Sequence, residues 1–164
     1  MTKTRILNRI YILIALGALF GAFLLRSTLL KESSLTTVEQ SDLHTADGYI
    51  QAGNKRIPVS IADTSQARQR GLSGTASLPS GTGKLFVFDK ADIYTFWMKD
   101  MRYPIDIVWI DESWKVVDVT EAVSPETYPA TFSPNTPARY VLEVNAKEAV
   151  VDNLVIGTQL RLEK

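Results

Sequence analysis

The sequence predicts a compact, mainly β domain of barrel or sandwich type with one or two short helices, preceded by an N-terminal transmembrane helix. Short segments rich in Val, Ile, Phe, Tyr and Trp recur from residue 48 onwards, and Gly, Pro, Asp and Ser separate them. Many short strands with few helical turns are typical of barrels and sandwiches. One uncharged apolar run, residues 10–25, precedes these strands.

The first strands are expected in "GYIQAGNKRIPVSIAD", residues 48–63. Gly53-Asn54 suits the positive dihedral angles of a hairpin turn. Pro58 has no N–H to donate, so the second strand should lie at an edge or at a bulge. Further strands are predicted for "GKLFVF" (83–88), "IYTFWMK" (93–99), "PIDIVWI" (104–110), "KVVDVTEA" (115–122), "RYVLEV" (139–144) and "QLRLE" (159–163).

Two short helices are expected between these strands. Asp63 with Gln66 three residues later predicts a helix cap, and Gly71 predicts the helix end. A second helix is expected over about residues 146–153. The loop 124–137 contains four prolines, and it is interpreted either as a lid or binding loop or as a rigid crossover that packs on the barrel through its aromatic residues.

The amino end predicts an uncleaved membrane anchor. Residues 1–9 carry three basic residues and should stay in the cytoplasm, while residues 10–30 form the anchor. The segment "RSTLLKESS" that follows offers no A-x-A-like cleavage site, which argues against a removed signal peptide. Residues 31–47 are a polar linker, so residues 48–164 are expected in the periplasm, held to the inner membrane by a single pass.

Composition excludes several classes of chemistry. The chain has no cysteine and one histidine, His44, so disulfides, thiolate zinc sites, cysteine nucleophiles and histidine triads are absent. Its 18 basic and 18 acidic residues cancel, which argues against a nucleic-acid partner. Neither a cofactor nor a metal is predicted, and any metal would need oxygen ligands.

Charged residues inside two predicted strands suggest a site. Strand alternation places Asp106 on a face with Val108 and Ile110 that is otherwise apolar. The connection "DMRYP" is short enough for a hairpin, which would make Lys99 and Asp106 neighbours across a ladder. Glu143 is a third charged residue inside a predicted strand, on the face of Arg139 and Val141.

One interpretation groups these residues around a cleft that binds a ligand. The expected ligand-binding residues are Arg70, Trp97, Lys99, Tyr103, Asp106 and Glu143. The catalytic candidates among them are Lys99, Asp106 and Glu143, since carboxylates and a lysine can perform acid and base chemistry.

The alternative interpretation is structural. Lys99 with Asp106, and Arg70 with Glu143, would then be two ion pairs, and removing one partner of a buried pair costs about 3–5 kcal/mol without any catalysis. Trp97 and Trp109 are expected in the core because they lie in strands. Trp114 lies in a turn, and the sequence leaves two interpretations of it: an exposed contact residue, or a cap that folds over the core.

The segments "ADTSQARQRGLSG", "GKLFVF", "FWMKDMRYPIDIVWID" and "RYVLEVNA" resemble the bacterial and archaeal family of domain of unknown function 192 over about residues 48–163. The most specific match is the F-W-M-K block followed by P-I-D-I, residues 96–99 and 104–107. Ser73-Gly74 and Ala146-Lys147 depart from the usual pattern. The resemblance implies a compact, mainly β domain, often secreted or membrane-anchored, and it implies no activity.

These observations favour a membrane-anchored extracytoplasmic module that binds a small molecule, a glycan or a peptide beside Trp97 and Lys99. One alternative is a hydrolase or lyase that uses the carboxylates. Another is a scaffold that helps to assemble a complex of envelope proteins.

Overall fold

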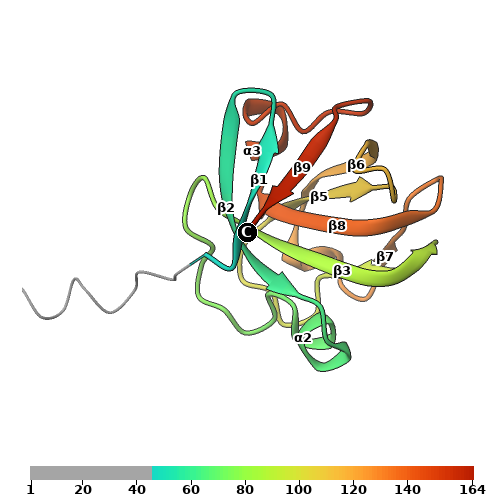
Figure 1. Cartoon of the computed structure of the whole chain (residues 1–164). Coiled ribbons are helices and arrows are strands. Elements are labelled where there is room, and N and C mark those ends of the chain that lie inside the picture. Colours follow the sequence, from blue (N-terminus) through green and yellow to red (C-terminus); the bar gives the residue numbers. More distant parts are fainter. Residues whose placement is uncertain (1–45) are drawn as a thin grey trace, which may run out of the picture. The chain divides into compact units, whose positions relative to one another are not determined.

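The computed structural model describes residues 46–164, and its main element is a seven-stranded curled sheet with the order β6-β5-β8-β3-β2-β1-β9 (Figure 1). The strands are β1 Gly48–Ala52, β2 Lys55–Ala62, β3 Gly83–Asp92, β4 Phe96–Trp97, β5 Ile105–Ile110, β6 Val116–Val123, β7 Thr131–Phe132, β8 Ala138–Asn145 and β9 Leu160–Glu163. All neighbours in the main sheet are antiparallel except β2 and β3, which are parallel. The predicted mainly β class is confirmed.

The predicted basic segment, membrane anchor and most of the linker lie outside the described residues. Within residues 46–164, no helix has the length and apolar character needed to cross a membrane.

The predicted first hairpin is confirmed, with Gly53 at φ 59° in the turn between β1 and β2. The sequence predicted that β2 lies at an edge or at a bulge, and the first of these is wrong for the strand as a whole, because Val59–Ala62 pair with β3 on the other side. Pro58 lies just before that segment, opposite Tyr49. At this point β2 has a neighbour on one side only, which explains how the sheet tolerates a proline.

Both predicted helices are present and short. Helix α2 spans Ser65–Arg70 and ends at Gly71 with φ 51°. Its cap is Thr64, not Asp63: the Thr64 Oγ1 accepts a hydrogen bond of 3.1 Å from the Ala67 N–H. Helix α3 spans Glu148–Val151, inside the predicted range.

The predicted strand over residues 93–99 shrinks to the two residues of β4, which pair with β7 and not with the main sheet. Strand β7 belongs to the proline-rich loop, which also contains the short 3-10 helix η1, Pro125–Thr127. Phe132 packs against the core. For this part of the loop, the interpretation as a crossover packed on the barrel is therefore the correct one. Met98 is buried, whereas Trp97 is 53% exposed, and the prediction that Trp97 is a core residue is wrong.

The main sheet buries side chains on both faces, as the alternation along β5 shows. Val108 and Ile110 pack with Ala149 of α3 on one face, called here the α3 face. Ile107 and Trp109 pack on the other, called here the α2 face because Ala67 of α2 contacts the same cluster. All six residues of β5 are therefore buried, and the prediction that Trp109 is a core residue is confirmed.

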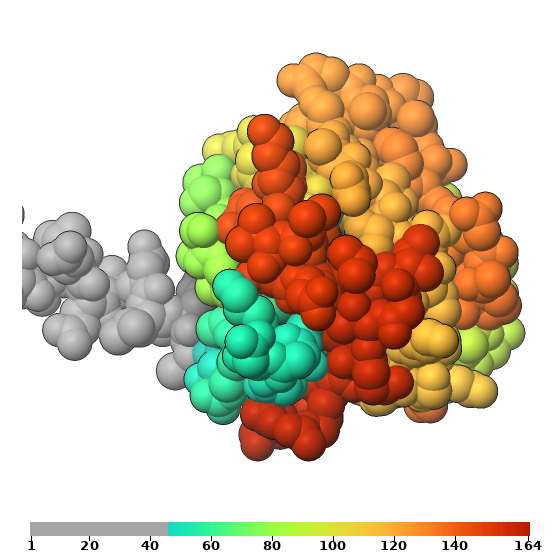
Figure 2. Space-filling model, turned by 90° about the horizontal axis from the view of Figure 1, so that it is seen from above, coloured from blue at the N-terminus to red at the C-terminus, as the bar shows by residue number. Residues whose placement is uncertain are grey.

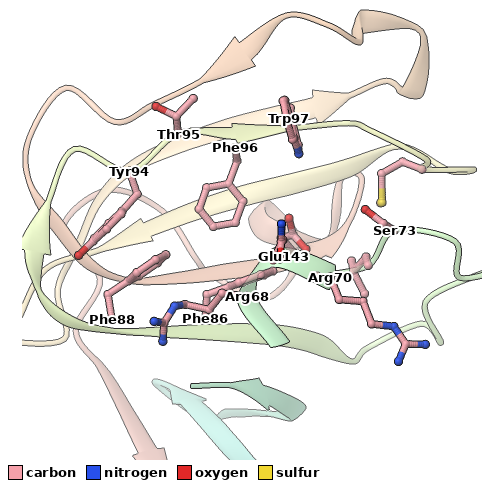
Figure 3. Close-up of a pocket in the computed structure, with 14 residues that line it drawn as sticks. Arg68, Arg70, Ser73, Phe86, Phe88, Tyr94, Thr95, Phe96, Trp97 and Glu143 are labelled. Atoms are coloured by element: carbon pink, nitrogen blue, oxygen red, sulfur yellow. The ribbon is translucent and has the colours of Figure 1, made fainter. Parts of the chain in front are cut away.

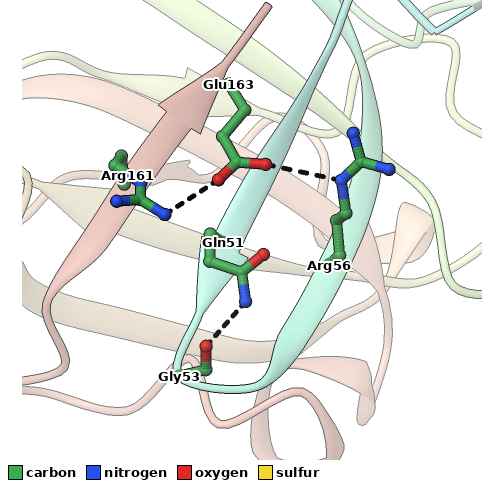
Figure 4. Close-up of polar contacts among 5 residues, drawn as sticks. All are labelled: Gln51, Gly53, Arg56, Arg161 and Glu163. Carbon is green, nitrogen blue, oxygen red and sulfur yellow. Dashed lines mark hydrogen bonds and ion pairs between the residues drawn. The ribbon is translucent and has the colours of Figure 1, made fainter.

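The two ends of the described chain meet in the sheet. Strand β9 pairs with β1, and the Glu163 carboxylate lies 2.9 Å from the Arg161 Nη2 and 3.5 Å from the Arg56 Nε (Figure 4). In the space-filling view, the β1–β2 hairpin lies against atoms of the C-terminal segment (Figure 2). A bridge between Lys115 and Gln159 also brings the start of β6 to β9, which curls the sheet towards closure.

Candidate functional site

A cavity of ≈ 300 Å³ lies on the α2 face. Its lining comes from α2 and the turn after it, from β3, from residues 94–97, from Met101 and from Glu143 of β8 (Figure 3). These segments are far apart in the sequence, and the order of the strands brings them together. The volume lies at the lower end of the range typical of ligand sites, about 300–1,000 Å³.

Aromatic side chains form most of one wall. Phe96 packs edge-on against Phe86 and Trp109, with ring centroids 4.9 and 5.4 Å apart. Phe88 stacks on Tyr94 at 3.5 Å. The short strand β4 is thus held over the main sheet by ring packing, which is worth about 0.5–1.5 kcal/mol for each such pair beyond the area it buries.

Glu143 is the polar group at the inner end of this wall. The register places it between Lys84 of β3 and Ile107 of β5, on the α2 face as the alternation predicted. Its side chain is buried, and its Oε2 has no hydrogen-bond partner among the described residues. Burial raises the pKa of Glu143 to about 8, against the opposing influence of the Lys84 charge. The carboxyl group is therefore protonated at neutral pH and can donate a hydrogen bond.

Lys84 lies opposite Glu143 in the neighbouring strand β3, outside the residues that line the cavity, and was not predicted. Its Nζ is 3.4 Å from the Ser60 Oγ, a weak hydrogen bond. Desolvation lowers the pKa of Lys84, Glu143 and Asp47 act in the opposite direction, and the Arg70 charge lowers it further. A signal was present in "GKLFVF", where alternation puts Lys84 on the same face as Phe86 and Phe88.

The two arginines that line the cavity differ in their contacts. Arg68 is held in place: its Nη1 donates to the backbone oxygens of Asp63 and Val87 at 2.6 and 2.8 Å, and its guanidinium lies 5.1 Å from the centre of the Phe88 ring. Arg70 is exposed, and its guanidinium points away from the aromatic wall (Figure 3). The predicted ion pair between Arg70 and Glu143 does not form, because no ion pair among residues 46–164 joins them.

The predicted pairing of Lys99 with Asp106 is wrong. Strand β5 pairs with β6 and β8, and β4 pairs with β7, so the two residues are not in one hairpin. Asp106 lies on the α3 face, 1% exposed, and accepts hydrogen bonds from the Ala122 and Ala149 N–H groups at 2.7 and 3.0 Å. The sheet therefore separates Asp106 from Glu143, and the two carboxyl groups cannot act on one substrate.

Lys99 is exposed and lies 5.8 Å from the centre of the Trp97 ring. It lies outside the cavity wall, whereas Trp97 is at the rim with an edge-on contact of 6.1 Å to Tyr128. Of the predicted ligand-binding residues, the cavity thus unites Arg70, Trp97 and Glu143 and leaves Lys99 and Asp106 aside.

Tyr103 lies beside the cavity, not in its wall. Its hydroxyl is 2.6 Å from the Thr75 Oγ1. Desolvation raises the pKa of Tyr103, and the Glu143 charge adds to that rise. Trp114 stacks on Tyr140 at 3.9 Å, so of its two interpretations the folded cap is confirmed.

The cavity offers one neutral carboxyl group and two guanidinium groups, those of Arg68 and Arg70, beside apolar rings. Residues 46–164 contain no group of three His, Cys, Asp or Glu side chains able to hold a metal ion. The site can therefore orient an apolar molecule and donate hydrogen bonds to it.

The fold and the site define the class of protein: a curled, mainly β domain with an aromatic-lined cavity on one face. The family model described as "Uncharacterized ACR, COG1430", domain of unknown function 192, matches residues 49–162. The chain belongs to this family, as its motifs predicted. No curated protein matches the chain.

Two crystal structures are similar in fold. One is a protein of unknown function from Novosphingobium aromaticivorans DSM 12444, 22% identical, with a TM-score of 0.64 over 70% of this chain and 83% of that chain. The other, described as a "putative transcription regulator", is from Sinorhizobium meliloti 1021, 23% identical, with a TM-score of 0.64 over 70% of this chain and 91% of that chain. At this identity they support the fold alone.

Proposed function

We propose that the domain binds a small molecule in the cavity of the α2 face, with Glu143 as its polar anchor. The observation that carries this proposal is the Oε2 of Glu143, which is buried at an aromatic-lined cavity without a hydrogen-bond partner. Buried polar atoms without partners are rare in proteins because each costs about 1–3 kcal/mol. A bound molecule that pairs with the carboxyl group would recover part of that cost.

The shape of the cavity favours a small molecule over a peptide or a glycan chain. Ligand sites are concave and mostly apolar, with a few polar groups that fix orientation. The cavity meets this description with Phe86 and Phe96 in its wall and Glu143 at its inner end. Trp97, at the rim, is placed to cover a bound molecule.

A fragment screen on the full-length chain, purified in detergent and observed by NMR, tests the proposal. We expect fragments that bind the wild type to lose about tenfold or more in affinity on Glu143→Leu, since the apolar leucine side chain offers no hydrogen bond. Glu121→Leu, at an exposed position of β6, is the matched control and should leave binding unchanged. If no fragment depends on Glu143, the proposal is wrong.

A second candidate function, acid catalysis in a hydrolase or lyase, is favoured by one observation. The raised pKa of Glu143 is what a general acid requires at neutral pH. However, Glu143 is the only carboxyl group in the cavity wall, and Asp106 is on the other face. Because no second carboxyl group lies beside it, binding is the better-supported function.

We further propose that the chain is a single-pass protein of the inner membrane, with residues 48–164 in the periplasm. The support is the uncharged run 10–25 and the basic residues before it. Alkaline phosphatase fused after Lys164 should be active, and a fluorescent protein that folds only in the cytoplasm should be dark there. The reverse pattern would contradict this topology.

A further inference from the structure

Two basic residues lie next to Glu143: Arg70 lines the cavity, and Lys84 lies opposite Glu143 in the neighbouring strand. Lys84 and Arg70 come from β3 and from the end of α2, and the Arg70 charge reaches the Lys84 amine strongly enough to lower its pKa. No ion pair within 4.0 Å among residues 46–164 involves either side chain. The Asp47 charge raises the pKa of Lys84, but the Asp47 carboxylate already accepts a hydrogen bond from the Ile61 N–H.

We propose that the cavity takes a small organic anion, a carboxylate on an apolar body, whose negative charge lies between Arg70 and the Glu143 carboxyl group, with Lys84 on the adjacent strand. This inference rests on the proposed binding function and names the ligand class for the same site. The apolar body would lie against Leu72 and Phe96, which line the cavity.

The hydrogen-bonding chemistry of the three polar groups agrees with an anion. Arg70 has only donors, and Lys84 is a donor whether or not it is charged. Glu143, protonated at neutral pH, adds an O–H that can donate to a carboxylate, and such a charge-assisted bond is stronger than a neutral one. A cationic ligand would instead meet Arg68 and Arg70, both of which line the cavity.

Arg70 is the group that must move. Its guanidinium points outward in the unliganded molecule (Figure 3). Its side chain is long, and no ion pair among residues 46–164 holds it, so a rotamer change brings it to the cavity without a change in the backbone. Arg68 is not available for this role because two backbone oxygens hold its Nη1.

The proposal also fixes the direction of the pH dependence of binding. Two titratable groups interact electrostatically with Glu143: Lys84 of β3 and Tyr103 of the segment before β5. Its neighbour in β5, Ile107, is apolar. When Glu143 loses its proton, it repels an anion and no longer donates. The affinity for an anion should therefore fall as the pH rises through about 8.

Three probes that share one ring and differ in charge test the inference: benzoate, benzamide and benzylamine. We measure their affinities by NMR titration of the full-length chain in detergent, with Glu143→Leu as the reference for partition into micelles. At neutral pH we expect benzoate to bind about tenfold or more tightly than benzamide, and benzylamine to bind most weakly. Glu143→Gln should keep benzoate binding, since its amide donates, and should abolish the fall near pH 8.

Arg70→Met separates an anion site from a merely apolar one. It should weaken benzoate by about fivefold or more and leave benzamide unchanged, because only the anion interacts with the guanidinium. Arg102→Met, at another exposed arginine outside the cavity, is the control and should change neither.

The possible results separate this inference from the binding function on which it rests. If benzamide or benzylamine binds as tightly as benzoate, or if Arg70→Met leaves benzoate unaffected, the ligand is not an anion and the inference is overturned while the binding function stands. Failure of benzoate to bind also overturns the inference, and the binding function then depends on the fragment screen. If benzoate does not bind and no fragment in the screen depends on Glu143, both the inference and the proposed binding function are wrong.

Discussion

Asp106→Leu should destabilise the domain by about 2–6 kcal/mol, since each of two buried N–H groups left without an acceptor costs about 1–3 kcal/mol. The groups are those of Ala122 in β6 and Ala149 in α3. Equilibrium unfolding in denaturant measures the loss. Asp92→Leu, at the exposed end of β3, is the control and should change stability by no more than about 0.5 kcal/mol.

The physical reason is the position of Asp106 at an irregularity of the sheet. The register between β5 and β6 shifts between Ile105 and Ile107, and Ala122 opposite them has φ 50°. The Asp106 carboxylate accepts the N–H of this bulge with one oxygen and the first turn of α3 with the other. A variant that unfolded at the same denaturant concentration as the wild type would contradict this structural role.

The second large effect concerns Glu143 and pH. Its pKa is about 8 in the folded chain and has an ordinary value of 4.5, so between these values the folded state binds the additional proton. Stability therefore has its full value below about pH 4.5, falls as the pH rises through the window, and levels off above about pH 8. The loss should be on the order of a few kcal/mol.

Glu143→Gln removes this titration and should flatten the dependence of stability on pH across the window. Above pH 8 the variant should be more stable than the wild type, because it buries a neutral amide where the wild type buries a charge. Glu121→Gln, on the exposed part of β6, should keep the wild-type profile. Lys84, whose pKa is lowered, contributes with the opposite sign, adding stability as the pH approaches 10.5. A wild-type profile that is already flat would exclude a buried, protonated Glu143.

Alternation along single strands predicted which face each residue occupies. It placed Glu143 with Val141, and Asp106 with Val108. Both assignments are confirmed, because Glu143 lines the cavity with Phe86 and Phe96 and Asp106 accepts a hydrogen bond from Ala149 on the α3 face. The first hairpin, the turn glycines and both helices were likewise predicted, because their signals are local. Membership of the family followed from the F-W-M-K and P-I-D-I blocks.

Which strands become neighbours was not predictable in the same way. The short connection between β4 and β5 suggested a hairpin, but the ring of Phe96 packs between Phe86 and Trp109, and β4 pairs with β7 instead. Lys99 and Asp106 consequently do not form the pair that the sequence suggested, and neither of them lines the cavity. Alternation could place Lys84 on the face of Phe86, but its position opposite Glu143 follows from the pairing of β3 with β8, which the sequence does not indicate.

The pairing of β9 with β1 has a consequence for how the domain is made. Residues 160–163 complete the sheet beside residues 49–52, more than a hundred positions earlier in the sequence. During synthesis β1 and β2 can pair at once, but one side of β1 stays open until residues 160–163 are available. Contacts of such long range slow folding and leave an unpaired strand edge exposed in the meantime. The nascent domain is thus exposed to aggregation until β9 is made, and a variant that lacks residues 160–163 keeps that exposure permanently.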